Sequence, residues 1–248
     1  MVEFEIRECV SHEEFDQCIE VQRQVWNYSD LDVMPHHSYV ITRNTGGFTL
    51  GAFSPSRDLW GFVHTWLARR DGAACFYSHM LAVREERQSE GIGRSLKFAQ
   101  RHEALRRGSD RIVWTFDPLQ SRNADFNLNR LGVTSRTYEV NYYGMTSTSP
   151  LHRGLETDRL FVDWWLNSSR VLAHVRGESP WRGTPSAEIE IPPDIHRLKS
   201  DDPERARRAQ LEVRLKFLDL LGAGMYVGGF RRAAGGDRSA YLLFEGKE

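Results

Sequence analysis

The feature that most limits how this chain can fold is a segment in which a strand, a glycine-containing loop and a helix follow one another. Residues 81–96 read Leu-Ala-Val-Arg-Glu-Glu-Arg-Gln-Ser-Glu-Gly-Ile-Gly-Arg-Ser-Leu. The pattern predicts a strand that ends at Val83, a loop that presents Gln88-x-x-Gly91-x-Gly93, and a helix that begins at once. A strand followed directly by a helix favours a mixed α/β architecture.

The first turn of a helix has backbone N–H groups without intrahelical acceptors and lies at the positive end of the helix dipole. Glycines allow a phosphate to approach that backbone closely, so a pyrophosphate is the natural ligand. A tight strand-to-helix turn without a ligand is the alternative. No Gly-Lys-Ser/Thr follows, which excludes a P-loop, and Lys97-Phe98 stands where a dinucleotide fingerprint needs a small residue.

Hydrophobic periodicity and turn residues predict the remaining elements. Together they give a mixed central sheet flanked by helices, followed by a small C-terminal α/β appendage. We therefore divide the chain into a domain over 1–166 and an extension over 167–248. The predicted strands are 3–9, 47–54, 59–68, 74–83, 111–116, 133–141, 159–166, 187–191, 225–231 and 240–244, and the predicted helices are 11–26, 35–45, 93–107, 121–131 and 203–221.

The composition of the chain limits which classes of partner we expect. The net charge of the 248-residue chain is −1, so nothing in the charge balance calls for nucleic acid or an anionic membrane. Three scattered cysteines form neither a disulfide framework nor a metal site. The chain starts directly into a strand-like pattern, and no apolar run is long enough to cross a bilayer. We expect a cytoplasmic protein without a bound metal.

The Leu-x-Val strand end and Gln88-x-x-Gly91-x-Gly93 at a helix start resemble the coenzyme A signature of the GNAT superfamily of N-acetyltransferases. The order of elements over 3–166 is similar to that fold, and Ala124 and Leu131-Gly132 are spaced as in the family's later helix. The resemblance is to a branch with a C-terminal extension. Asp117-Pro118-Leu119, Ser121-Arg122-Asn123-Ala124 and Asn141-Tyr142-Tyr143-Gly144 carry this part of the resemblance. Relatives of that kind have been connected with N-acylation of amino acids, including transfer of succinyl.

The resemblance implies which residues hold the donor, acetyl-CoA or succinyl-CoA. Backbone amides from Gln88 to Arg94 would bind the pyrophosphate, and the strand end would pair with the pantetheine arm. A backbone N–H near Leu81 would polarise the thioester carbonyl in a gap between this strand and 111–116. The implied donor-binding residues are Met80, Leu81, Ala82, Val83, Gln88, Ser89, Glu90, Gly91, Ile92, Gly93, Arg94 and Asn123.

The sequence departs from the family pattern at two positions. Ser121 stands where the family often has Asn, although Asn123 is close. Leu128 stands where many members carry the Tyr that protonates the leaving thiolate. Tyr138, Tyr142 or Tyr143 would then replace that acid, or water would serve.

An amine must lose a proton before it can attack a thioester, so a base within reach is useful. His79, on the strand before the loop, is the first candidate, and a histidine satisfied inside the sheet is its alternative. Asp117 ends the next predicted strand, and capping the Pro118 turn is its alternative. His64 is a weaker candidate, while Glu85 and Glu86 are expected to face solvent.

Other residues lie near the expected acceptor region. The pair His36-His37 would gate or read the substrate, or would simply be a surface pair, and no third metal ligand accompanies it. Tyr142, in Asn-Tyr-Tyr-Gly, would contact the acceptor or pack at a strand end. Arg122 would pair with a substrate carboxylate or remain a surface residue.

We expect an enzyme that transfers an acetyl or other short acyl group (succinyl among them) from acyl-CoA to a small-molecule amine by direct attack, with an amino acid as the first acceptor to test. His79, Asp117 and Tyr142 are the expected catalytic residues. A non-catalytic acyl-CoA sensor or partner-binding subunit is the alternative. A homodimer through the C-terminal extension is a further expectation, compatible with both.

Overall fold

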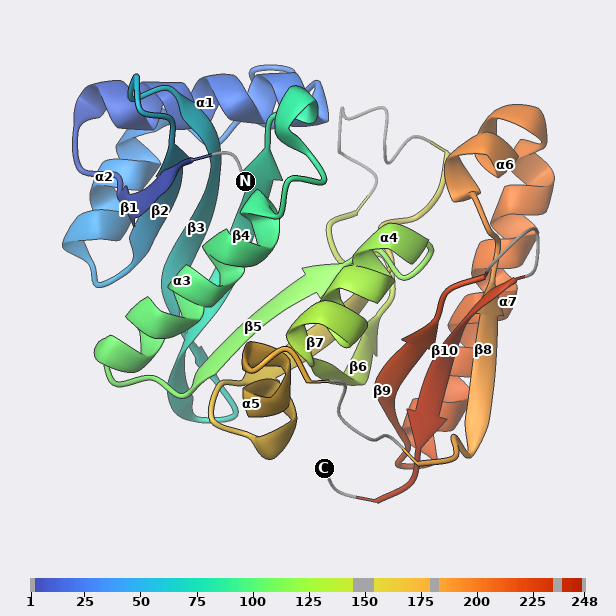
Figure 1. The fold of residues 1–248 in the computed structure, drawn as a ribbon. Helices are drawn as coiled ribbons and strands as arrows, with labels where there is room; N and C mark the ends of the chain where they lie inside the picture. Colours follow the sequence, from blue (N-terminus) through green and yellow to red (C-terminus); the bar gives the residue numbers. More distant parts are fainter. Residues whose placement is uncertain (1–2, 145–153, 179–182, 234–237, 247–248) are drawn as a thin grey trace. The chain divides into compact units, whose positions relative to one another are not determined.

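The computed structural model describes residues 3–144, 154–178, 183–233 and 238–246. The chain forms two compact units, the first running to Val113 and the second starting at Trp114. Figure 1 shows the elements of each unit. Each unit is described by itself.

The first unit contains an antiparallel sheet in the order β1-β2-β3-β4, and β5 joins β4 in parallel. The strands predicted over 47–54, 59–68 and 74–83 are β2, β3 and β4, and they pair antiparallel. The elements are β1 (Glu5–Glu8), α1 (His12–Trp26), α2 (His36–Asn44), β2 (Phe48–Phe53), β3 (Leu59–Arg70), β4 (Ala73–Val83), the 3-10 turn η1 (Glu85–Arg87), α3 (Ile92–Arg106) and β5 (Arg111–Phe116), whose last residues belong to the second unit.

Helices cover both faces of this sheet. Phe15 of α1 and Tyr39 of α2 share one buried cluster with Met80 of β4. On the opposite face, Lys97 of α3 donates a hydrogen bond to Ser78 Oγ of β4 at 3.0 Å. The first unit is therefore a helix–sheet–helix sandwich, the layering expected for a mixed sheet.

Strand β4 contains one extra residue. Thr65 pairs with Ser78 and His64 with Met80, so His79 has no partner residue in β3. Such a β-bulge bends a strand and redirects a side chain, and bulges are frequent beside active sites.

The second unit contains antiparallel strands in the order β7-β6-β9-β10-β8. Its elements are α4 (Ser121–Ala124), the π-helix η2 (Asp125–Leu131), β6 (Thr134–Glu139), β7 (Arg159–Trp165), α5 (Ser169–Val175), β8 (Ala187–Ile191), α6 (Ile195–Asp201), α7 (Pro203–Gly222), β9 (Tyr226–Arg231) and β10 (Ser239–Phe244).

Long-range packing ties the C-terminal extension to the rest of this unit. Phe217 of α7 stacks on Tyr138 of β6 with ring centroids 5.1 Å apart, and Ser135 of β6 pairs with Val227 of β9. Contacts within the unit therefore cross residue 166, where we placed the domain boundary. That boundary stays a prediction.

Three elements differ from expectation. The predicted helix over 121–131 is one turn of α-helix followed by a π-helix, and the short helices α5 and α6 were not predicted. Ser168 and Asp194 cap the latter two with side-chain acceptors, so their start signals were present in a proline-rich stretch.

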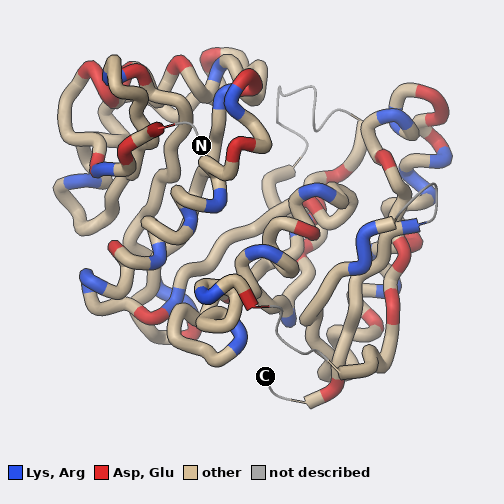
Figure 2. Tube along the Cα trace, viewed as in Figure 1, with Lys and Arg blue, Asp and Glu red and all other residues tan. Residues whose placement is uncertain are grey.

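Acidic and basic residues are interspersed along the trace of each unit (Figure 2). Within the described ranges, no helix is both long and apolar enough to cross a membrane.

Candidate functional site

The loop after β4 ends at an open helix start. Ser89 and Gly91 have φ values of 70° and 86°, and Gly91 is the N-cap of α3. Over the residues that the structure describes, no side chain caps this helix, and its first turn carries no acidic residue. N–H groups in a first turn lack intrahelical acceptors. The start of α3 can therefore accept an anion.

The two loop glycines differ in their surroundings. A Cβ on Gly91 would meet nothing within 4 Å, whereas a Cβ on Gly93 would contact Val83 Cγ2 at 3.8 Å and Leu81 Cδ2 at 3.9 Å. The open space at the helix start thus lies at Gly91. Gly93 faces β4, where an extra methyl group would make only ordinary contacts.

Gln88 supports the loop. Its backbone N–H donates to the Glu85 carbonyl at 3.2 Å, and its side-chain Nε2 donates to the Val83 carbonyl at 3.3 Å. The Gln88 amide is therefore engaged within the loop, which leaves Ser89 to Arg94 as the stretch suited to an incoming phosphate. Glu85 and Glu86 are exposed, as expected.

The end of β4 carries the residues expected to meet the pantetheine arm. The parallel pairing of β4 with β5 inside the first unit joins Phe76 to Ile112 and Tyr77 to Val113. Beyond the bulge, Met80 and Ala82 belong to the cluster under α1, and Leu81 lies near Gly93 of α3. Strand, loop and helix start thus follow one another within the first unit, with Met80 and Ala82 buried and Leu81 half-buried.

His79 occupies the bulge and is half-buried. Its ring stacks on Trp66 with centroids 3.9 Å apart and an interplanar angle of 17°. Burial lowers the pKa of His79 to about 4, so the ring is neutral at pH 7. A neutral imidazole holds a lone pair that can accept a proton.

His64 differs from His79. It is fully buried, and its ring nitrogens bond Thr49 Oγ1 at 2.7 Å and Thr42 Oγ1 at 3.3 Å. Burial, and then the neighbouring His79, lowers the pKa of His64 to about 3. His64 is therefore a packed structural histidine and a poor candidate base.

The His36-His37 pair is split in the structure. His36 bonds Asp16 Oδ1 through Nδ1 and His12 Nδ1 through Nε2, both at 2.7 Å, while His37 is exposed. This chain of contacts joins α1 to the start of α2. No group of three or more His, Cys, Asp or Glu side chains suited to a metal ion occurs among the described residues.

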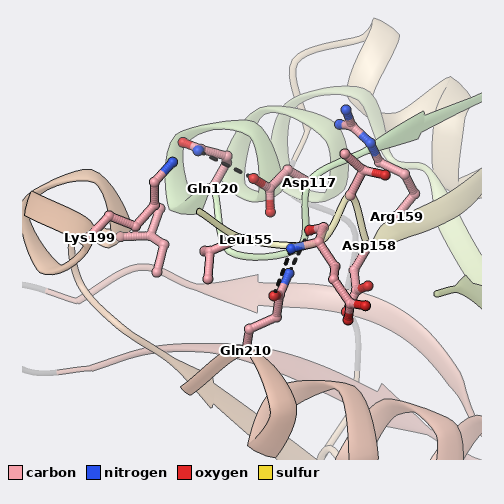
Figure 3. Close-up of a pocket in the computed structure, with 10 residues that line it drawn as sticks. Asp117, Gln120, Leu155, Asp158, Arg159, Lys199 and Gln210 are labelled. Carbon is pink, nitrogen blue, oxygen red and sulfur yellow. Dashed lines mark hydrogen bonds between the residues drawn. The ribbon is translucent and has the colours of Figure 1, made fainter. Parts of the chain in front are cut away.

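Asp117 lies in the second unit and closes its own turn. Its Oδ1 accepts the Leu119 N–H at 2.9 Å, and its Oδ2 accepts from Gln120 Nε2 at 3.4 Å. Figure 3 shows the carboxylate in a small crevice that Lys199 and Gln210 also line. Asp117 thus caps its own turn, as the alternative interpretation predicted. A catalytic role for Asp117 stays a prediction.

Asn123 is exposed on α4. It lines an open groove with Arg122, His196 and Arg232, which come from three separate segments of the second unit. The groove places two guanidinium groups where a carboxylate or phosphate could bind.

The tyrosines proposed as proton donors have different environments. Tyr138 is buried and donates to Asp158 Oδ2 at 2.7 Å, and burial followed by that carboxylate raises its pKa far above the ordinary value. Tyr142 is exposed, and Tyr143 Oη lies 3.1 Å from Thr115 Oγ1. Leu128 is fully buried in η2. Tyr138 therefore donates to Asp158, and Tyr142, Tyr143 or water stays the predicted source of the proton.

Sequence reasoning missed the burial of Lys97. Its Nζ contacts Gln100 Oε1 at 2.7 Å and Ser78 Oγ at 3.0 Å, and Gln100 continues to Thr65 Oγ1 at 2.8 Å. Burial lowers the pKa of Lys97 well below its usual value. The polar spacing of Lys97 and Gln100 on the buried side of α3 was the available signal.

Comparison with known proteins places the fold. No family model and no curated protein matches the sequence. Solved structures do match: a Desulfovibrio desulfuricans protein assigned to the GNAT family of acetyltransferases has a TM-score of 0.54 and 13% identity, covering 66% of this chain and 99% of that one.

Two further structures agree. The ribosomal-protein-S18-alanine N-acetyltransferase from Escherichia coli has a TM-score of 0.52 and 12% identity, covering 67% of this chain and 96% of that one. The NatC complex bound to Gag peptide and CoA has a TM-score of 0.52 and 15% identity, covering 65% and 98%. The predicted α+β architecture is confirmed: this chain has the fold of the GNAT acetyltransferases, with about a third of its length outside the match.

Proposed function

We propose that the protein is an acyl-CoA-dependent N-acyltransferase that acts on the amine of a small molecule. The observation that carries the proposal is the open start of α3, which follows β4 directly and has free space at Gly91. Helix starts of this kind bind phosphate groups. The GNAT fold and the CoA bound to the NatC complex support the same ligand.

In this proposal the backbone from Ser89 to Arg94 binds the pyrophosphate of the donor. The residues present fit such a group, because Gly91 leaves the cradle open and no acidic side chain lies in the first turn. The segment Met80–Val83 holds the pantetheine arm, and Asn123 completes the proposed donor contacts. Acetyl-CoA and succinyl-CoA are the donors to test first.

The acceptor amine must arrive at the thioester carbonyl without its extra proton. In the proposed reaction the amine nitrogen bonds to the carbonyl carbon, the carbon–sulfur bond breaks, and the proton lost by the amine passes to His79. The neutral state of His79 at pH 7 supports this role, because the ring can then accept a proton. Asp117 is the second candidate base.

The leaving thiolate needs a proton at the end of the reaction. Leu128 cannot supply one, so Tyr142 or water is the proposed donor. Because the thiol of coenzyme A is a fair leaving group, water suffices for measurable turnover. An amino acid is the acceptor we favour, and Arg122 is the residue proposed to pair with a substrate carboxylate.

The decisive experiment combines donor binding with thiol release. Thermal shift and calorimetry with acetyl-CoA and succinyl-CoA should show binding, because a ligand that binds only the folded state raises apparent stability. Free thiol should then appear with a panel of amines. His79→Ala, Asp117→Ala and Tyr142→Phe, measured with the best amine, identify base and acid. Absence of any CoA binding contradicts the proposal.

A non-catalytic acyl-CoA sensor is the second candidate. It is favoured by Leu128, which stands where the resemblance implies a Tyr that protonates the thiolate. Tight binding of acetyl-CoA without thiol release on any amine in the panel would support the sensor over the enzyme.

We also propose that the C-terminal extension forms a homodimer contact through α7. Leu211, Leu215 and Leu218 of α7 are each at least 44% exposed and follow one face of the helix. Leu215→Lys should convert a dimer to a monomer in light scattering, and a wild-type monomer contradicts this part of the proposal.

A further inference from the structure

The bulge in β4 determines where His79 points. Ser78 faces α3, where Lys97 bonds it, and Met80 faces the cluster under α1. His79 contacts Trp66 and His64 on the face that α2 covers, so two consecutive residues of β4, His79 and Met80, lie on the same face. The bulge therefore places the extra side chain, His79, on the face of the sheet that α2 covers.

Trp66 makes the closest ring contact of His79. Their centroids are 3.9 Å apart with planes 17° from parallel, whereas His64 and Tyr77 lie 6.1 Å and 6.4 Å from His79 at steeper angles. The residue directly opposite Trp66 in β4 is Tyr77. The indole thus reaches diagonally across the bulge and covers one face of the imidazole.

Nothing else within the described residues orients the His79 ring by hydrogen bonding. No hydrogen bond joins the ring nitrogens of His79 to another described group. Neither nitrogen is among the fully buried polar atoms that lack a hydrogen-bond partner. His64, in contrast, is clamped on both nitrogens by Thr42 and Thr49. Ring stacking is therefore the contact that fixes the plane of His79.

Simple core packing does not explain Trp66. Its side chain is 36% exposed, so a large apolar ring at this position leaves much of its surface in water. A threonine or another β-branched residue would suit a half-exposed strand position at least as well. Trp66 also stacks on Tyr77, its pair in β4, with ring centroids 6.1 Å apart, but His79 is the nearer ring at 3.9 Å.

We propose that Trp66 is the positioning residue of His79: the stacked indole holds the imidazole plane, shields one face from water, and leaves the ring nitrogens to take the proton of the acceptor amine. The inference rests on the proposed function for the last step only. Shielding from water disfavours a charged imidazole, in agreement with the lowered pKa of His79.

The direct test is an NMR titration of the His79 imidazole, with its signal assigned through His79→Gln. In Trp66→Ala the titration midpoint should rise by at least one pH unit toward the ordinary value of about 6.5. Trp66→Phe should keep most of the wild-type value, because a phenyl ring can still stack. An unchanged midpoint in Trp66→Ala overturns the inference.

Leu67→Ala is the matched control. Leu67 is the next residue of β3, faces the other side of the sheet and is 55% exposed. Its truncation removes a comparable exposed side chain without touching His79, and it should leave the midpoint in place. A shift of equal size in Leu67→Ala would mean that the strand as a whole responds, and would also overturn the inference.

Kinetics provide the second arm. Trp66→Ala should lower kcat about 10-fold or more, within the range of general-base effects, and should move the acidic limb of the pH profile upward. The double variant with His79→Gln should be no slower than His79→Gln alone, since residues that act through one another are not additive. Additive losses contradict the inference.

The two proposals fail in different ways. If wild-type protein binds acetyl-CoA but acylates no amine, the proposed enzymatic function is wrong. The NMR titration midpoint of His79 still tests the stacking on Trp66. Wild-type activity that survives His79→Gln removes His79 as the base. A normal His79 dependence with an unchanged midpoint in Trp66→Ala removes Trp66 alone.

Discussion

The two fifteen-residue helices of the first unit begin in opposite ways. At α1, Ser11 Oγ accepts the Glu14 N–H, and the Glu14 carboxylate accepts the Ser11 N–H, which closes a capping box. At α3, Gly91 offers no side chain and the space beside it is open. The same backbone groups are satisfied by a side chain at α1, whereas no described side chain satisfies them at α3.

The difference teaches what a helix start can be used for. A capped start contributes to folding stability by about 1 kcal/mol. A helix start without a cap lacks that contribution to folding stability. The same backbone N–H groups can then contribute to the binding affinity of an anion. The comparison predicts that changes at α1 alter stability while changes at α3 alter ligand binding.

The largest expected effect is at Gly91. Gly91→Glu places a carboxylate in the open space, so CoA affinity should fall at least 100-fold in calorimetry, or about 3 kcal/mol. Gly108 follows the other end of α3 with a φ of 82° and similarly empty surroundings. Gly108→Glu therefore imposes the same backbone strain without facing the ligand, and its affinity should be unchanged. Equal losses in both variants would break the comparison.

Lys97, in the second turn of α3, should show the next largest effect. Burial lowers its pKa in the folded protein, while the unfolded chain binds its proton up to about pH 10.4. Between those two pKa values the unfolded state carries the extra proton, so wild-type stability should rise with pH relative to Lys97→Met by about 1.4 kcal/mol per pH unit.

Urea unfolding of both proteins at several pH values measures that slope. Loss of the hydrogen bonds to Gln100 and Ser78 in Lys97→Met lowers the free energy of unfolding by the same amount at every pH, so it does not change the slope of that free energy with pH. Parallel stability curves would mean that Lys97 is charged in the folded state.

Ser11→Ala tests the closed helix. Loss of the capping box should lower the free energy of unfolding by about 1 kcal/mol, while the CoA affinity stays the same. Thermal unfolding with and without acetyl-CoA separates the two quantities. A changed affinity would show that the α1 start is not independent of the ligand site.

The smallest effect is expected at Gly93. Alanine is a better helix former than glycine, and the added methyl group would make only ordinary contacts with Val83 and Leu81. Gly93→Ala should therefore raise stability by roughly 0.5–1 kcal/mol and keep its backbone N–H for the ligand. A loss of CoA affinity as large as that of Gly91→Glu would show that both glycines face the phosphates.

Much of this architecture was readable from local sequence signals. The predicted helices 11–26 and 93–107 match α1 and α3 closely, since a Ser-x-x-Glu pattern begins at Ser11 and a glycine, Gly108, follows α3. The strand 111–116 was placed with its observed bounds. These features are encoded by residues within one or two turns of each other, which is why a single sequence reveals them.

Features that depend on distant partners were not readable. Nothing in the residues of β4 marks His79 as the extra one, because a bulge is defined only against the register of β3. Helical spacing placed Lys97 beside Gln100, but the full burial of its Nζ became visible only with Ser78 of β4 placed against it. The role of Asp117 depended on whether its carboxylate bonds its own turn, which required coordinates.

The register of β3 and β4 has a consequence for protein engineering. Deleting one residue from a strand ordinarily exchanges its two faces. At His79 the opposite holds, because Ser78 and Met80 already face opposite sides and already pair with consecutive residues of β3. Removing His79 would leave every other residue pair between β3 and β4 in register and every other side chain on its present face. We therefore expect deletion of His79 to disturb the sheet less than deletion of any other residue of β4.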